Sequence, residues 1–323
     1  YFSKAFNAKV MDRFISIDWG TTNLRMYLVA LPSLQVIKSS KDLQGIKSLH
    51  LKAKNEHREV SVFLKSYLMM QLQKAFGSLP EAIPILISGM ASSKLGLFDL
   101  PYAKLPQDLS HPKLQIKQSQ LKNHPLYVIS GLSTKDDILR GEETQLIGLH
   151  HLLSINTSST VIIPGTHSKH MFCAEGVLTQ FKTYMTGELF ELLTKHSILE
   201  NAVSLPENDE PLWDAFIEGV SEAGQASLLH NIFTVRVKQI LENLDGFSNY
   251  FYLSGLLIGA EILALKTQGH QHIYVFASGA LSQCYEKAIK ILLPDCSLEV
   301  VTEEKQERAF ILGQYLIYKT FKS

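Results

Sequence analysis

The sequence predicts an α/β protein of two domains, and three observations carry this prediction. At 323 residues the chain is too long for one small core, and its 46% hydrophobic and 19% charged residues are typical of globular proteins. Apolar strand segments alternate with helical segments along the whole chain. Each half also opens with a strand, a Gly-Thr turn and a second strand. We therefore expect one domain over residues 11–155 and another over residues 156–323.

The first half begins with two strands joined by a tight turn, because short runs of β-branched and aromatic residues flank a Gly and an Asn. A helical apolar pattern and two fully apolar strands follow, and an acidic cluster begins a second helix. The stretch from Met90 to Pro125, rich in Pro, Ser and Lys, is expected to be irregular. The predicted strands are 14–17, 24–30, 83–89 and 126–131, and the predicted helices are 59–76 and 142–153.

The second half repeats this plan with more helix. Its opening strand leads into two paired strands around the turn Glu175-Gly176, because both flanking segments alternate in hydrophobicity. Four helices, one strand and two further helices follow. The predicted strands are 160–165, the paired segments 170–176 and 178–187, and 273–279, and the predicted helices are 187–199, 211–230, 231–244, 250–265, 280–293 and 304–321.

Composition argues against several kinds of partner. Lys plus Arg equals Asp plus Glu at 31 each, so no net field draws the chain to nucleic acid or to an anionic membrane. The longest apolar run, 250–265, contains Glu261 and is short for a membrane span, so it predicts a buried core helix. Three scattered cysteines fit a reducing cytosol. The residues before Met11 lack the features of a targeting segment, so we expect a cytoplasmic protein that begins near Met11.

The first turn, in "FISIDWGTTNLRMYLV" (14–29), places Asp18, Gly20, Thr21, Thr22 and Asn23 at the tip of a hairpin. Gly, Asn and Thr form turns in any protein, so a turn with no further role is one reading. The second turn offers the other reading, because the same pattern recurs there.

In "IIPGTHSKH" (162–170), Gly165 and Thr166 again follow an apolar strand. Two such tips, one per domain, can offer backbone N–H groups and hydroxyls to a polyphosphate from both sides, which predicts a nucleotide clamp. A carboxylate beside phosphates can orient Mg²⁺ directly or through water, which gives Asp18 a role. Lys169 can add a point charge for the same phosphates.

Other nucleotide motifs are absent from the sequence, since neither GxxxxGK[ST] nor GxGxxG occurs. A third element, where a strand runs through Ser278-Gly279 into a helix, would let an adenosine approach the backbone. Strand–Gly–helix junctions are also common without any ligand. His167 and His170 have no further ligands at a spacing typical of zinc sites, so we expect no metal there.

The richest acidic cluster is "ILRGEETQLIG" (138–148). Glu142 and Glu143 are favourable in the first turn of a helix for purely structural reasons, and Arg140 would then be a surface charge. The functional alternative is a general base that accepts a proton from an attacking hydroxyl, with Arg140 near an anionic group of the substrate. Further along, Thr186 is expected to cap a helix, and Glu188 follows it.

The chain resembles the 2-dehydro-3-deoxygalactonokinases, bacterial sugar-acid kinases with the ribonuclease H-like ATPase fold of actin, hexokinase and the heat-shock chaperones. The segments that carry the resemblance are "IDWGTTNLR", "RGEETQLIG", "PGTHSK", "FKTYMTGEL" and "LSGLLIGAE". The resemblance implies two lobes, each a mixed sheet flanked by helices, with an interlobe cleft and a final helix that packs back on the first lobe. It also implies transfer of the γ-phosphoryl group of ATP to the 6-hydroxyl of 2-dehydro-3-deoxy-D-galactonate in galactonate catabolism.

The resemblance also assigns residues. It implies a first phosphate segment of Asp18, Gly20, Thr21, Thr22 and Asn23, a second of Gly165, Thr166, His167 and Lys169, and an adenosine segment at Ser278 and Gly279. It implies Arg140, Gly89 and Met90 in sugar-acid binding, and Mg²⁺ near Asp18. Glu142 stands six residues before Gly148, where related kinases carry their base; Glu143 is the next candidate and Asp99 a third.

One region departs from the family pattern. Segment 88–106 has Ser92 and Lys94 where we expect Gly and Asn, and Leu97 where we expect Trp. Three alternatives therefore stay open at this point: a kinase of another keto-deoxy acid, a kinase of a neutral sugar, and a nucleotide-binding regulator without catalysis. The oligomeric state also stays open, with a homodimer as one option.

Overall fold

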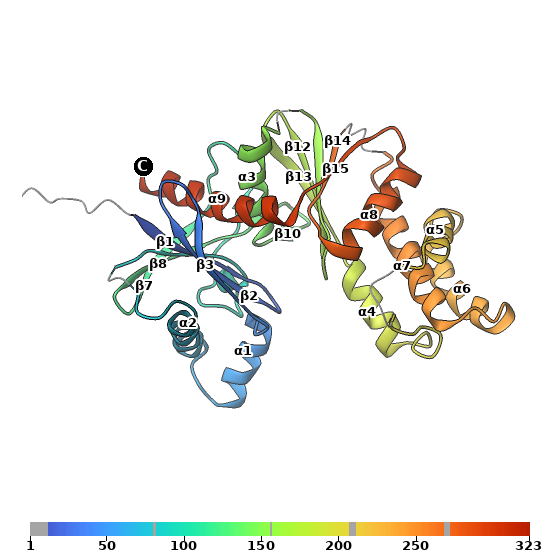
Figure 1. Ribbon diagram of the computed structural model, residues 1–323, viewed down its shortest axis with the longest axis horizontal. Coiled ribbons are helices and arrows are strands. Elements are labelled where there is room, and N and C mark those ends of the chain that lie inside the picture. Colours follow the sequence, from blue (N-terminus) through green and yellow to red (C-terminus); the bar gives the residue numbers. More distant parts are fainter. Residues whose placement is uncertain (1–11, 80–81, 156, 207–210, 268–271) are drawn as a thin grey trace, which may run out of the picture. The chain divides into compact units, whose positions relative to one another are not determined.

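The computed structural model describes residues 12–79, 82–155, 157–206, 211–267 and 272–323 (Figure 1). The chain divides into two compact units, which we call unit 1 and unit 2. Unit 1 comprises the chain up to Leu153 together with Glu307–Ser323, and unit 2 comprises Ser154–Gln306. Most of the C-terminal helix therefore belongs to unit 1, although it follows unit 2 in sequence. Within the described residues, no helix is both long and apolar enough to cross a membrane.

Unit 1 is built on a six-stranded mixed sheet of order β3-β2-β1-β4-β8-β7. β1 pairs antiparallel with β2 and parallel with β4, so it lies between these two strands in the sheet. The strands are β1 (Arg13–Trp19), β2 (Leu24–Ala30), β3 (Val36–Asp42), β4 (Ile85–Gly89), β7 (Ile116–Leu121) and β8 (His124–Ile129). Shorter elements are β5 (Ala103–Lys104), β6 (Gln107–Asp108), β9 (Leu132–Ser133), β10 (Ile138–Leu139) and the 3₁₀ turn η1 (Met90–Ser92).

Helices cover both faces of this sheet. This is expected because successive side chains of β1 point to opposite faces and buried apolar residues lie on both. Ile15, Ile17 and Trp19 face a core formed with α1 (Ile46–Asn55) and α2 (Val60–Phe76). Phe14 faces the other side and packs in a cluster with Phe310 of α9 (Glu303–Lys322). Figure 1 shows α9 on the side of the sheet opposite α1 and α2. The α/β class with helices on both faces of a mixed sheet is confirmed.

In unit 1, α3 (Glu142–Leu153) and α9 cross so closely that their backbones are in contact at two glycines. A Cβ atom added to Gly148 would lie 1.7 Å from the carbonyl oxygen of Ala309, and one added to Gly313 would lie 1.9 Å from that of Thr144. Glycine is therefore required at both positions, because real side chains cannot approach so closely. This crossing fixes the start of α3 relative to the sheet.

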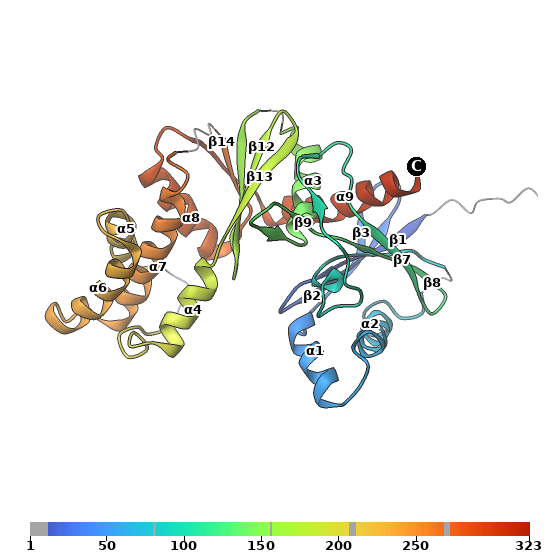
Figure 2. The same ribbon diagram turned by 180° about the vertical axis from the view of Figure 1, so that it is seen from behind.

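Unit 2 contains a mixed sheet in which β15, β14, β11, β12 and β13 are neighbours in that order. The strands are β11 (Ser159–Ile163), β12 (Ser168–Ala174), β13 (Val177–Tyr184), β14 (His272–Val275) and β15 (Ser297–Val300). The helices are α4 (Thr186–His196), α5 (Trp213–Glu222), α6 (Leu228–Leu241), α7 (Gly246–Leu263) and α8 (Gly279–Leu292). α7 contacts α4, α5, α6 and α8, so it is the central helix of unit 2 (Figure 2).

The prediction missed several elements of the fold and placed others wrongly. The elements that were not predicted are β3, α1, β7 and β15. β3, for example, has the sequence VIKSSKD and exposes most of its residues, so it lacks the apolar alternation of a buried strand. The predicted helix boundary at 230/231 is wrong, because α5 ends at Glu222 and the Ser227 hydroxyl caps the start of α6. The predicted strand 273–279 ends already at Val275.

Candidate active site

The first turn lies at the carboxyl end of β1, where three elements of unit 1 meet. The parallel pairing of β1 and β4 places Asp18 beside Ser88 and Trp19 beside Gly89. Gly89 has φ +95°, and a Cβ atom there would lie 2.7 Å from the carbonyl oxygen of Trp19. Only glycine allows β4 to end so close to β1. Residues 17–19 and 87–89, distant in sequence, thus share one strand end.

The turn itself is closed on its carbonyl side by a helix that the sequence did not predict. The Gly20 N–H donates to the Asn23 carbonyl at 2.9 Å, so it is used inside the turn. The Ile46 N–H at the start of α1 donates to the Gly20 carbonyl at 3.0 Å. Thr21 and Thr22 are exposed. The Thr22 hydroxyl accepts from the Asn23 side-chain amide at 3.0 Å, and Asn23 is half-buried, so this turn presents polar side chains to solvent while Gly20 shapes its backbone.

Asp18 is a carboxylate in a restricted setting, since about a quarter of its side chain (24%) reaches solvent. Burial raises its pKa to about 6; Arg25, whose Nη1 lies 3.6 Å from Oδ2, opposes this rise, and the charge of Glu142 adds to it. Asp18 and Glu142 therefore interact although 124 positions separate them in sequence. Two carboxylates that repel one another at a glycine-lined strand end are suited to a cation.

Glu142 and Glu143, adjacent in sequence, have different surroundings. Gly141, with φ +111°, places the start of α3 next to Gly89, because a Cβ atom there would lie 3.3 Å from the Gly89 Cα. Glu142 is partly exposed, and its Oε2 accepts from the Arg140 N–H at 2.9 Å. Glu143 is 1% exposed, and its oxygens accept from the Gly141 N–H at 2.9 and 2.7 Å.

The pKa of Glu143 is raised to about 8, first because the group is buried and second because Glu142 repels its charged form. Hydrogen bonds and the charge of Arg140 oppose this rise without cancelling it. A pKa of about 8 favours the protonated form of Glu143 at neutral pH. Of the two carboxyl groups, Glu142 is the one that a substrate can reach.

Arg140 lies against the 88–106 segment. Its Nη1 donates to the Ser92 hydroxyl at 2.6 Å and also to the Ser92 carbonyl. Its guanidinium carbon lies 4.2 Å from the ring centroid of Tyr102. A stacked, hydrogen-bonded guanidinium is held in one orientation, which suits recognition of a planar carboxylate. In this segment Met90 is half-buried, and Asp99 is exposed.

A buried amide, which the sequence did not single out, supports the strand ends. Gln314 of α9 is fully buried; its Nε2 donates to the Ile17 carbonyl at 2.9 Å and to the Ser88 hydroxyl at 3.0 Å. The Ser16 hydroxyl donates to Gln314 Oε1 at 2.7 Å, and the Thr144 hydroxyl donates to Ser88 at 3.0 Å. This network joins α9, α3, β1 and β4 immediately behind Asp18.

In unit 2 the second turn is supported by the start of α4. Gly165, Thr166 and His167 are exposed. A Cβ atom on Gly187 would lie 2.4 Å from the Gly165 carbonyl oxygen, and the Glu188 N–H donates to the Thr166 carbonyl at 2.9 Å. His167 Nε2 lies 2.6 Å from Glu188 Oε2. The segment "TGEL" (186–189) at the start of α4 thus packs against the second turn and supports it.

These two turns, with the glutamates of α3, are the features by which the sequence resembled a kinase family. The sequence model of the 2-keto-3-deoxy-galactonokinase family matches residues 18–313. The chain belongs to this family.

Two curated relatives agree with this assignment. The 2-dehydro-3-deoxygalactonokinase of Escherichia coli (strain K12) is 30% identical over 287 residues, which cover 87% of this chain and 90% of that protein. The "Probable 2-dehydro-3-deoxygalactonokinase" of Rhizobium meliloti (strain 1021) is 30% identical over 285 residues, which cover 86% of this chain and 89% of that protein. The resemblance found in the sequence is thereby confirmed over most of the chain.

Solved structures support the same fold. A crystal structure from Sinorhizobium meliloti, assigned as a 2-dehydro-3-deoxygalactonokinase protein, matches with a TM-score of 0.80 and 27% identity over 95% of this chain and 96% of that chain. The activator of 2-hydroxyisocaproyl-CoA dehydratase from Clostridium difficile, solved with bound ADPNP, matches with a TM-score of 0.52 and 12% identity. The predicted two-lobed actin-like ATPase fold of the 2-keto-3-deoxy-galactonokinase family is confirmed.

Other predicted residues of this galactonokinase-family chain lie elsewhere in unit 2. Ser278 and Gly279 are exposed where α8 begins, and Gly279 has φ +63°. Lys169 is 7% exposed, and its ammonium donates to the Thr183 hydroxyl at 2.8 Å in the neighbouring strand. Because side chains alternate along β12, Lys169 lies on the opposite face from Ser168 and His170.

The expected cap at Thr186 is wrong. Met185 occupies the cap position of α4, and the Thr186 hydroxyl instead donates to the buried Glu261. Glu261 also binds His170, and within the described ranges no group of three or more His, Cys, Asp and Glu residues could hold a metal ion. The sequence reasoning missed this role of Glu261. A single acid within an apolar helix is the feature that could have indicated it, because buried glutamates are almost always paired.

Proposed function

We propose that this chain transfers the γ-phosphoryl group of ATP to the 6-hydroxyl of 2-dehydro-3-deoxy-D-galactonate. Membership of the galactonokinase family and two relatives of that name support the reaction. The single structural observation that carries the proposal is the packing of Gly141, directly before Glu142, against Gly89 at the strand end that also carries Asp18. Because the reaction consumes ATP in catabolism, we place the protein in the cytoplasm.

Glu142 is the proposed general base. It is partly exposed and fixed by the Arg140 N–H, whereas the buried Glu143 favours its protonated form at neutral pH, which cannot accept another proton. As the 6-hydroxyl oxygen bonds to the γ-phosphorus, Glu142 takes the hydroxyl proton. The bond from the γ-phosphorus to the β–γ bridging oxygen breaks, and ADP leaves with that oxygen.

Asp18 is the proposed holder of Mg²⁺, directly or through water. The site fits this ion, because Mg²⁺ in kinases commonly uses one or two carboxylates together with substrate phosphates, and Asp18 has Glu142 as a second negative group nearby. The ion, when bound, neutralises charge on the transferred phosphoryl group. Asp18 itself must be ionised for this role, and its pKa of about 6 allows that at neutral pH.

The remaining residues are proposed to bind the two substrates. Arg140, held by Ser92 and Tyr102, would bind the carboxylate of the sugar acid, next to Gly89 and Met90. The residues proposed for the nucleotide are Gly20, Thr21, Thr22 and Asn23 in unit 1 and Gly165, Thr166, His167, Lys169, Ser278 and Gly279 in unit 2. The buried Lys169 would attract the phosphates of ATP through its positive charge, from its position on β12.

The test is a turnover assay with ATP and a panel of substrates. The panel contains 2-dehydro-3-deoxy-D-galactonate, its stereoisomers and neutral hexoses, and formation of ADP is measured. We expect turnover with the galactonate derivative. Preference for another keto-deoxy acid would overturn the substrate assignment, and ATP binding without any turnover would favour a regulator.

The same assay tests the base. Glu142→Gln keeps the shape of the side chain but cannot take a proton, so it should lower kcat by on the order of 10² to 10⁴ while ATP binding persists. Glu143→Gln, the matched control one residue away, should stay active. If Glu143→Gln alone is inactive, the two roles are exchanged; if both variants are active, the base lies elsewhere, with exposed Asp99 the next candidate.

A further inference from the structure

Glu261, near the end of α7, is a buried carboxylate with a full set of donors. Its Oε1 accepts from the Ser168 hydroxyl at 2.7 Å and lies 2.7 Å from His170 Nε2. Its Oε2 accepts from the Tyr285 hydroxyl at 2.9 Å and from the Thr186 hydroxyl. Two donors on each oxygen use the accepting capacity of a carboxylate.

This carboxylate is ionised despite its burial. Only 1% of its side chain is accessible, and burial alone would raise the pKa. Hydrogen bonds from His170, Ser168 and Thr186, together with the charge of His170, outweigh burial and hold the pKa of Glu261 below its ordinary value. An anion is therefore fixed in the interior of unit 2 by donors that come from three different elements.

Those donors belong to the elements that frame the second turn. Ser168 begins β12 directly after the exposed turn residues 165–167. Thr186 begins α4, directly before Gly187, which packs against the Gly165 carbonyl, and two residues before Glu188, whose N–H binds Thr166. One carboxylate thus ties both chain segments that determine the shape of the turn.

The third element is α8. Tyr285 lies in this helix, which begins at Gly279 beside Ser278. The Tyr285 hydroxyl therefore anchors Glu261 to α8 at a position six residues beyond Gly279, away from the helix start that is the proposed adenosine segment. Glu261 itself does not reach a ligand, because its side chain is enclosed.

We propose that Glu261 is a positioning residue for the phosphates of ATP: it holds the 165–167 turn, the start of α4 and α8 in one arrangement without touching the nucleotide. This inference rests on the proposed function, in which that turn binds phosphate. It predicts that loss of the Glu261 charge lowers the affinity for ATP, which carries the phosphates, more than the affinity for adenosine.

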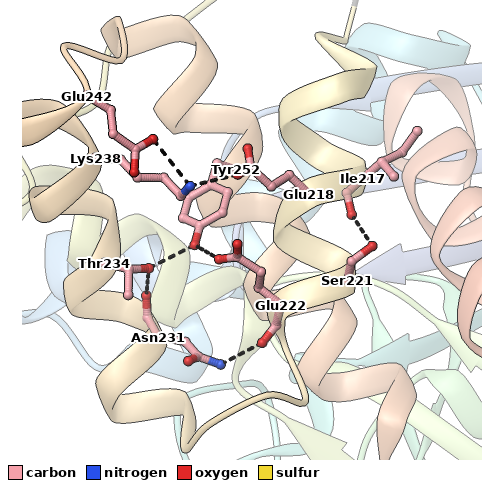
Figure 3. A network of polar contacts seen from close by, with 9 residues as sticks. All are labelled: Ile217, Glu218, Ser221, Glu222, Asn231, Thr234, Lys238, Glu242 and Tyr252. Atoms are coloured by element: carbon pink, nitrogen blue, oxygen red, sulfur yellow. Dashed lines mark hydrogen bonds and ion pairs between the residues drawn. The ribbon is translucent and has the colours of Figure 1, made fainter.

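Unit 2 offers a matched control on the same helix (Figure 3). Tyr252 of α7 is fully buried, and its hydroxyl donates to Glu222 and lies 2.8 Å from the Thr234 hydroxyl. Figure 3 also shows Lys238, which lies 2.7 Å from Glu218 and whose ammonium lies 4.9 Å from the centroid of the Tyr252 ring. These residues come from α5, α6 and α7. Tyr252→Phe therefore removes one tyrosine–glutamate hydrogen bond, as Tyr285→Phe does, although the Tyr252–Glu222 bond is only partly buried and lies at a place that does not frame the turn.

The experiment measures the dissociation constants of ATP and adenosine for the wild-type chain and three variants, below the unfolding temperature of each. Glu261→Gln should weaken ATP binding at least about tenfold, which is roughly 1.4 kcal/mol, and change adenosine binding less than about twofold. Tyr285→Phe should shift the ratio in the same direction by about threefold, because one of four donors is lost. Tyr252→Phe should leave the ratio unchanged.

An unchanged ratio in folded Glu261→Gln would overturn the inference, as would an equal shift in Tyr252→Phe. If Glu261→Gln does not fold, Tyr285→Phe decides by the same ratio. Turnover of the wild-type chain is measured separately. Wild-type protein that binds ATP without phosphorylating any sugar acid would contradict the proposed function, while the binding ratio would still decide the role of Glu261.

Discussion

Glu143 carries a prediction about stability that follows directly from its surroundings. The side chain is 1% exposed, holds the Gly141 N–H, and has a pKa of about 8 against an ordinary value of 4.5. Glu143→Gln keeps the size of the group and replaces the acid O–H by an amide N–H. The variant therefore resembles the protonated wild-type side chain at every pH.

The sign of the effect follows from proton linkage. In the folded state Glu143 keeps its proton up to about pH 8, whereas in the unfolded chain it loses it near pH 4.5. The folded state binds more protons between these values, so the free energy of unfolding of the wild-type chain falls as pH rises through this window. At about 1.4 kcal/mol per pKa unit, the loss is up to about 5 kcal/mol. Glu143→Gln should not show it.

Fluorescence can follow unit 1 by itself, because the chain has two tryptophans and only Trp19 lies in that unit. In a Trp213→Phe background, urea unfolding would be measured between pH 6 and pH 8, above the range in which Asp18, with a pKa of about 6, contributes most. We expect Glu143→Gln to be more stable than its parent by a margin that grows by up to about 3 kcal/mol over this range.

Two results would refute this reasoning. Parallel curves for parent and variant would show that Glu143 does not retain a proton in the folded state. A variant less stable than its parent at pH 8 would show that the buried group is an ionised acceptor whose charge is needed. Glu142→Gln, at a partly exposed neighbour, is the control and should change the slope only slightly.

Three further predictions concern activity and packing. Asp18→Asn should lower kcat at least about a hundredfold, a few kcal/mol, with smaller loss of ATP affinity; near-normal kcat would remove Asp18 from the mechanism. Arg140→Lys should raise the KM for the sugar acid more than the KM for ATP, because the stacked guanidinium is lost; steady-state kinetics showing equal effects would contradict this. Gly148→Ala should destabilise unit 1 by at least about 2 kcal/mol in urea unfolding, since its Cβ would lie 1.7 Å from the Ala309 carbonyl oxygen; Gly165→Ala, with no atom within 4 Å, should not destabilise unit 2.

The sequence predicted those elements whose pattern is local. The β1–β2 hairpin, α2 and α3 were found because apolar residues repeat at the period of the element and turn residues bound it. β3 was missed because an edge strand with exposed lysines and serines lacks that repeat. α1 was also missed, although its first N–H groups complete the turn at Gly20.

For the site, the sequence by itself determined which residue types stand at the two turns and at the start of α3, and these were enough to indicate the kinase family. It could not separate Glu142 from Glu143, because the two are adjacent in sequence and only the packing of α3 buries one and leaves the other accessible. Burial also decided the roles of Gln314 and Glu261. Their partners lie far away in the chain, and their hydrogen bonds exist only after helix and sheet have come together. The tertiary structure therefore decided the protonation and orientation of the groups, since both depend on dielectric surroundings and donors that no local pattern records.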